Sequence, residues 1–108
     1  MENFTKYCKF LGLKKPVEIT LTDKVTKKWD AFYLPRYNKK GKLKNHCITI
    51  SIAGNRDINT LVMHELIHAW QEEKRKTEIH GKHFRKWAKK AYLHFGLSQV
   101  FIKGVDKK

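Results

Sequence analysis

Two histidines and a glutamate form the most distinctive chemical pattern of this chain of 108 residues: His64, Glu65 and His68 are arranged as HExxH. On a helix, residues four apart lie on one face, one turn above the other. Two imidazoles placed in this way can bind one zinc ion, at about 2.0–2.1 Å each. A carboxylate beside the first ligand can then accept a proton from a water that zinc has acidified. The pattern predicts a zinc hydrolase in which Glu65 is the general base.

Catalytic zinc usually takes a third protein ligand and keeps one position for water. Glu72 lies about 12 Å from His64 along the helix axis, at a rise of about 1.5 Å per residue, and is too distant to join the site. The third ligand must therefore come from the chain after the helix has ended. The histidine candidates are His80 and His83, followed by Glu78 and His94.

A helix is predicted from Ile58 to about Lys74, because apolar residues surround the HExxH motif at helical spacing. Asn55 and Asp57 are candidates for its N-cap. The polar segment 74–78 predicts the end of this helix. A final helix is predicted over 81–95, closed by Gly96, with an apolar stripe that consists of Phe84, Trp87, Ala88, Ala91, Tyr92 and Phe95.

The first half of the chain is predicted to be rich in strands. Alternating apolar residues indicate strands over 17–22, 28–35 (ended by Pro35) and 46–52, with a lysine-rich turn over 37–45. A short helix is predicted over 3–12, and residues 100–102 could form a last short strand. We therefore expect a single α+β domain over residues 1–108, with a small, mostly antiparallel sheet of about three strands packed on the HExxH helix and a following helix.

The HExxH helix and the residues after it resemble the SprT-like metalloproteases, which include Spartan. The hallmark of that family is HExxH on one helix, then a His-Gly pair that opens the next helix, with Phe three residues beyond the Gly. This chain has His80-Gly81 and Phe84 in those positions. The strand residues 48–51 and the pair 60–61 also resemble the family. The resemblance implies a zincin-like fold, zinc as the cofactor and His80 as the third ligand.

The resemblance also implies a function, because Spartan-like members are DNA-dependent proteases that degrade proteins crosslinked to DNA. Many of them carry a zinc ribbon or a separate basic region for DNA. This chain has two cysteines and hence no four-cysteine set, so we expect any DNA contact to come from the protease domain itself. The hypothesis is a zinc endopeptidase that cleaves proteins bound or crosslinked to DNA. A strand ahead of the motif could pair with the extended protein substrate.

The charge balance independently favours a polyanionic partner. The chain has 24 Lys and Arg residues against 10 Asp and Glu residues, a formal net charge of +14. Nucleic acid is the commonest partner of such a surface, and single-stranded DNA is the favoured form here. Trp29 and Tyr37 lie beside basic loops and could stack on bases. The residues predicted to contact nucleic acid are Lys39, Lys40, Lys42 and Lys44 in the turn, and Lys82, Arg85, Lys86, Lys89 and Lys90 on the final helix.

Two other functions remain open. The chain could be a zinc-stabilised module that binds nucleic acid without proteolysis, although a purely structural zinc site has no need of Glu65. It could also be a zinc hydrolase that acts on a non-peptide substrate. Substituting Glu65→Gln separates the protease from the binding module, because only the protease needs the carboxylate.

The remaining features concern the compartment of the cell. Cys8 and Cys47 form no CxxC pair and no disulfide-rich pattern, which is typical of thiols in a reducing compartment. No apolar stretch approaches the roughly 18 residues of a membrane span, and the first residues lack a signal-peptide core. We expect a cytoplasmic monomer that makes no membrane contact.

Overall fold

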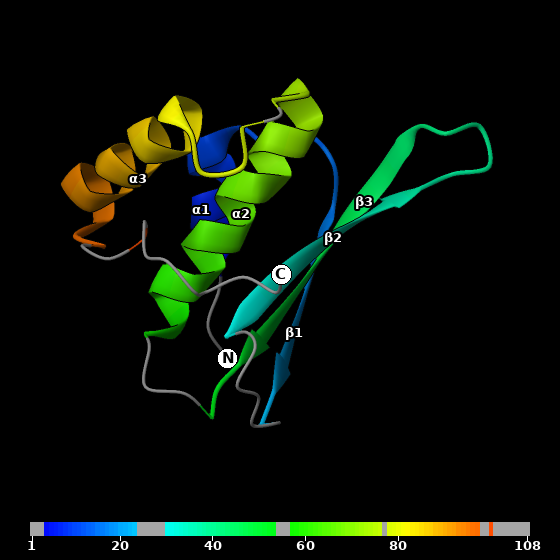
Figure 1. Ribbon diagram of the computed structural model, residues 1–108. Helices are drawn as coiled ribbons and strands as arrows, with labels where there is room; N and C mark the ends of the chain where they lie inside the picture. The colour runs from blue at the N-terminus through cyan, green and yellow to red at the C-terminus, as the bar shows by residue number, and fades with distance from the viewer. Residues whose placement is uncertain (1–3, 24–29, 54–56, 77, 98–99, 101–108) are drawn as a thin grey trace.

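The computed structural model describes residues 4–23, 30–53, 57–76, 78–97 and 100 (Figure 1). Together they form a small α+β unit with a three-stranded sheet. The elements follow in the order α1 (Thr5–Leu11), β1 (Val17–Thr22), β2 (Ala31–Tyr37), β3 (Leu43–Ser51), α2 (Ile58–Lys74) and α3 (Lys82–Phe95).

The sheet is mixed, so the prediction of a mostly antiparallel sheet is wrong. Its strand order is β1-β3-β2, with β3 parallel to β1 and antiparallel to β2. A tight hairpin joins β2 to β3 and forces that pair to be antiparallel, whereas β1 reaches β3 only through β2 and can run parallel to it. The alternation of apolar residues predicts which face a side chain takes. It does not predict which strand lies in the middle or in which direction neighbours run.

The second strand also differs from the prediction, since it continues through Pro35 to Tyr37. Pro35 pairs with His46, and β2 is an edge strand of the sheet. An edge strand tolerates a proline because the missing N–H can face away from the ladder. The predicted strand over 46–52 begins earlier, at Leu43, and ends at Ser51. Both changes shorten the predicted turn, which closes by the Asn38 N–H donating to the Lys42 carbonyl at 2.8 Å. Residues 28 and 29 lie outside the described residues.

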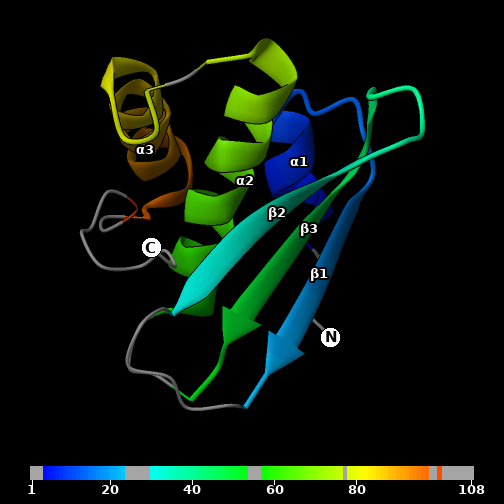
Figure 2. The ribbon, with the colours of Figure 1, turned by 45° about the vertical axis from the view of Figure 1, so that its right-hand side comes forward.

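All three helices lie on one face of the sheet (Figures 1 and 2). The predicted bounds of α2 are confirmed, and its residues Leu66 and Ile67 belong to one buried cluster with Ile48 and Ile50 of β3. Both α1 and α3 end at a glycine in the left-handed region, as predicted. Because α2 packs against the sheet on one side and α3 on the other, it is the element that positions the HExxH motif.

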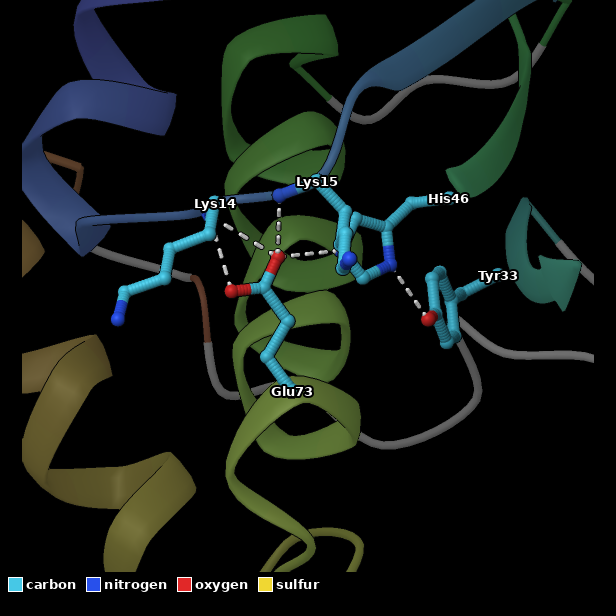
Figure 3. Close-up of polar contacts among 5 residues, drawn as sticks. All are labelled: Lys14, Lys15, Tyr33, His46 and Glu73. Atoms are coloured by element: carbon cyan, nitrogen blue, oxygen red, sulfur yellow. Dashed lines mark hydrogen bonds and ion pairs between the residues drawn. The ribbon is translucent and has the colours of Figure 1, made fainter. Parts of the chain in front are cut away.

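A partly buried polar network connects the C-terminal end of α2 to the sheet (Figure 3). Glu73 accepts the backbone N–H groups of Lys14 at 2.9 Å and Lys15 at 3.0 Å, and it contacts His46 Nε2 at 2.7 Å. His46 Nδ1 lies 2.7 Å from the Tyr33 hydroxyl. Burial acts to raise the pKa of Glu73, but the hydrogen bonds from His46 and the two backbone N–H groups outweigh it and lower that pKa. Glu73 is therefore held as a carboxylate, and it ties α2 to β3 and to the segment before β1.

Both cysteines are free thiols, as predicted, and burial raises the pKa of Cys8. Among the residues that the structure describes, no helix is long and apolar enough to cross a membrane.

Candidate metal centre

The helix that carries the HExxH motif is anchored at its start and along its length. The Asp57 side chain accepts the Thr60 backbone N–H at 3.0 Å, which confirms Asp57 as the N-cap; Asn55, the other candidate, lies outside the described residues. Every residue over 61–67 is buried, and Glu65 is 0% exposed. The fixed backbone therefore holds His64 and Glu65 in one place, and His68 follows one turn later on the same face.

Three histidines converge on one point: His64 and His68 on α2, and His80 in the connection between α2 and α3. Their candidate ligand nitrogens all lie within 4.8 Å of one another, and the Nε2 atoms of His64 and His80 are 3.3 Å apart. Two nitrogens bound tetrahedrally to one zinc ion at about 2.0–2.1 Å lie about 3.3 Å apart. The three imidazoles therefore fit a single zinc ion. His64 is buried and His80 is exposed, so the cluster is open to solvent on the side of His80.

Oxygen acceptors fix the rings of the two helical histidines. His64 Nδ1 lies 2.6 Å from the Val100 carbonyl oxygen, and His68 Nδ1 lies 2.9 Å from the Gln71 side-chain oxygen. An oxygen acceptor requires that Nδ1 carry the proton, and the lone pair is then on Nε2. Outer hydrogen bonds of this kind orient the ligands of metal sites and raise their basicity. In both His64 and His68, Nε2 therefore has a lone pair available for a metal ion.

Gln71 links two of the candidate ligands. Its side-chain oxygen accepts from His68, and its side-chain nitrogen donates to the Glu78 carbonyl at 2.8 Å, two residues before His80. The side chain is almost fully buried. The sequence reasoning missed Gln71, although its spacing of three from His68 places the two on one helical face. Val100 was also missed, because no local signal connects it with His64.

The substitution Gln71→Leu is expected to lower zinc affinity by about 10- to 100-fold, the usual effect of losing an outer hydrogen-bond partner of a metal ligand. Leucine is similar in size and favours helix, so the change chiefly removes the two hydrogen bonds. Competition against a chromophoric chelator measures the affinity. Gln71→Glu serves as the partner variant, because its carboxylate can still accept from His68, and we expect it to recover part of the loss. Zinc affinity within about twofold of wild type in Gln71→Leu would show that His68 needs no such support.

The turn that delivers His80 depends on close approach at Gly81. A Cβ atom added to Gly81 would lie 2.6 Å from the Glu78 Cβ and 2.3 Å from its carboxylate oxygen. The Gly81 N–H also donates to the Glu78 carbonyl at 3.1 Å. Glycine is needed here for space, since its φ of −82° is accessible to any residue. This tight turn places His80 directly before α3, opposite the two histidines of α2.

Phe84 forms the apolar wall of the histidine cluster. Its ring centroid lies 4.8 Å from that of His64, 4.9 Å from that of His68 and 5.0 Å from that of His80. The side chain is 0% exposed. An apolar neighbour of this kind limits solvent access and lowers the local dielectric constant around a metal site.

The other candidates for the third ligand lie outside the histidine cluster. His83 is half-buried beside Trp70, with ring centroids 6.2 Å apart, and His94 stacks on Phe10 at 5.0 Å. Glu72 accepts a hydrogen bond from the Tyr37 hydroxyl, in agreement with its exclusion from the site. Glu78 contributes its backbone carbonyl to Gln71. Among the described residues, the group with metal-ligand spacing is that of His64, His68 and His80.

The nine predicted nucleic-acid contacts are all exposed. Four of them lie around the β2–β3 hairpin turn, and the other five lie on α3. One, Lys90, places its ammonium group 4.6 Å from the Trp87 ring centroid, a distance typical of a cation–π contact. Their exposure is compatible with phosphate binding, and their role stays a prediction.

Comparison with known protein families returned one match. A family model described as the SprT-like family matches residues 9–100, which contain β1 to α3 and all three clustered histidines. Comparisons with curated proteins and with solved structures returned no match.

Proposed function

Because the chain belongs to the SprT-like family, we propose that it is a zinc-dependent endopeptidase that cleaves proteins bound or crosslinked to DNA. The family as a whole is metalloprotease-like and associated with zinc. The observation that carries the proposal is the convergence of His64, His68 and His80, with Glu65 buried beside the first of them. Three imidazoles are a ligand set typical of catalytic zinc, whereas structural zinc sites have four protein ligands.

Zinc, when bound by these histidines, polarises the scissile carbonyl and lowers the pKa of water. Glu65 supplies the proton transfer: its carboxylate accepts a proton from the attacking water and returns it to the leaving amine. The buried position of Glu65 keeps the carboxylate out of bulk water, where it would be screened. His64 and His68 donate their Nδ1–H groups to the Val100 and Gln71 oxygens. Their Nε2 lone pairs would be taken by zinc, which leaves Glu65 as the base.

The substrate chain would pair with β2. This strand is an edge of the sheet and packs against α2, whereas β3, the strand directly before the helix, has neighbours on both sides. An extended peptide added to β2 would be held by main-chain hydrogen bonds alongside the HExxH helix. Such pairing is largely independent of side chains and suits a protease that acts on diverse DNA-bound proteins.

The test is the cleavage of a basic DNA-binding protein by the purified enzyme, with and without a single-stranded oligonucleotide. Cleavage is expected to stop when zinc is removed by a chelator and to return when zinc is restored. Because DNA collects enzyme and substrate on one strand, its addition is expected to raise the rate about tenfold or more. A zinc-dependent cleavage rate that is the same with and without the oligonucleotide would contradict the proposal that the protease acts on DNA-bound proteins.

A second candidate is a zinc-stabilised module that binds nucleic acid without proteolysis. The exposed basic residues of the hairpin and of α3 favour it. Salt-sensitive DNA binding by a zinc-loaded protein that cleaves no substrate would support this module over the protease.

A further inference from the structure

A groove of about 670 Å³ lies at the C-terminal end of α2, against the segment between α1 and β1 and the β2–β3 hairpin. All three parts contribute cations to its lining, and every one of them is exposed. The cations are Lys14, Lys15, Lys42, Arg75 and Lys76. Only Lys42 belongs to the set predicted from the sequence to contact nucleic acid, so the groove is largely a different surface.

The two carboxylates in the groove lining are occupied by other partners. Glu73 takes backbone N–H groups and His46, and Figure 3 shows the Lys14 ammonium group pointing away from it. Glu72 takes the Tyr37 hydroxyl, and this hydrogen bond raises the pKa of Tyr37, so the hydroxyl keeps its proton. Within the described part of the chain, the ion pair formed is that of His46 with Glu73. Neither carboxylate is therefore paired with a cation of the groove.

Five cations against two carboxylates leave an excess of three positive charges in this one groove. Like charges held close together repel, and this repulsion is part of the cost of the overall charge of +14. An anionic ligand would relieve it. Lys39 and Lys40 are exposed in the same hairpin turn as Lys42, whereas Lys44 lines a different pocket.

The groove adjoins the candidate metal centre. Gln71 lines the groove and also holds His68. Glu72, another lining residue, follows Glu65 by seven positions, so the two lie on nearly the same face of α2, about 10 Å apart along the axis. A ligand bound in the groove at Glu72 would therefore lie about 10 Å along the helix axis from a peptide bond held at Glu65.

We propose that this groove binds the phosphates of single-stranded nucleic acid and holds the strand beside the proteolytic site. Binding of the strand stands by itself, whereas its connection with cleavage rests on the proposed function. Proteins that bind single strands combine a positively charged groove with aromatic rings on which bases stack. Tyr37 supplies such a ring, since it lines the groove and is 50% exposed.

Fluorescence anisotropy with a labelled oligothymidine tests the groove. The groove variant carries Lys15→Gln, Lys42→Gln and Lys76→Gln. The matched control carries Lys6→Gln, Lys9→Gln and Arg36→Gln, which lie outside both the groove lining and the nucleic-acid contacts predicted from the sequence. Both variants lose three positive charges from exposed side chains. The groove variant is expected to bind about 10- to 100-fold more weakly at about 0.1 M salt, and the slope of log K against log salt should fall by about 2, at roughly 0.7 per phosphate contact. The control is expected to change affinity by less than about threefold.

Equal losses of oligothymidine affinity in the two triple variants would contradict the proposal that the groove binds the strand. An absence of oligothymidine binding by the wild-type protein would contradict it as well. A polyglutamate peptide that competes as well as oligothymidine, and does so only when the groove lysines are present, would instead assign the groove to acidic peptides. Thermal unfolding of both variants checks that each is folded. The binding is repeated with Glu65→Gln protein, which separates a failure of the groove from a failure of proteolysis.

Discussion

Glu65→Gln is expected to reduce proteolysis by at least about 10²- to 10⁴-fold while leaving zinc binding and oligonucleotide binding within about twofold of wild type. Glutamine has almost the shape of glutamate, so it fits the same buried position. It cannot accept a proton from the attacking water, and the leaving amine then has no proton donor. Cleavage of a DNA-binding protein, zinc content and oligothymidine anisotropy are measured on the same preparations. The pattern expected is a loss in the first measurement alone.

The matched control is Glu18→Gln, which removes an exposed carboxylate from β1. Its neighbours Val17 and Ile19 pack against the core, so Glu18 lies on the opposite face of the sheet. It makes the same change of charge and is expected to cleave at the wild-type rate. Cleavage by Glu65→Gln within about threefold of wild type would show that Glu65 is not the base. Loss of zinc in that variant would show that the carboxylate supports the metal centre rather than the proton transfer.

The elements that position the site were predictable where their signals are local. The bounds of α2 and β1 were predicted correctly, because Asp57 supplies a cap and because helical and strand periodicities are contained in short windows. The sheet topology was not predictable, since the central place of β3 depends on contacts among segments far apart in the chain. The sequence predicts that Pro35 ends β2, and only the position of this strand at the sheet edge explains why it continues to Tyr37.

The candidate site also has a part that was predictable from the local sequence and a part that depends on tertiary contacts. His64, Glu65 and His68 follow from one helical turn, whereas reasoning from the residues left His80, His83, Glu78 and His94 open as the third ligand. What brings His80 forward is the turn at Gly81, where Glu78 approaches too closely for any side chain. Gln71 and Val100 hold the ligand rings through hydrogen bonds that form only in the folded chain. The sequence therefore specifies the chemistry of the centre, and the tertiary contacts specify its orientation.

His80→Ala is expected to weaken zinc binding by more than about 100-fold, beyond the loss caused by removing an outer partner such as Gln71. The variant leaves two imidazoles of the three, and catalytic zinc normally requires three protein ligands. His83→Ala is the matched control, because it removes a histidine three residues later that packs beside Trp70 and lies outside the cluster. We expect it to retain zinc and to lose only a little stability.

Zinc content after dialysis and competition against a chelator distinguish the two variants, and substitution by cobalt gives a second readout. The visible absorption of tetrahedral cobalt should be retained in His83→Ala and lost or shifted in His80→Ala, because that spectrum depends on the number and geometry of the ligands. His80 is exposed, so its removal should leave the fold intact and the loss can be assigned to the metal. Equal zinc affinity in His80→Ala and wild type, or a loss confined to His83→Ala, would move the third ligand to another residue. Proteolysis should follow zinc content in both variants, since the proposed mechanism needs the metal as well as Glu65.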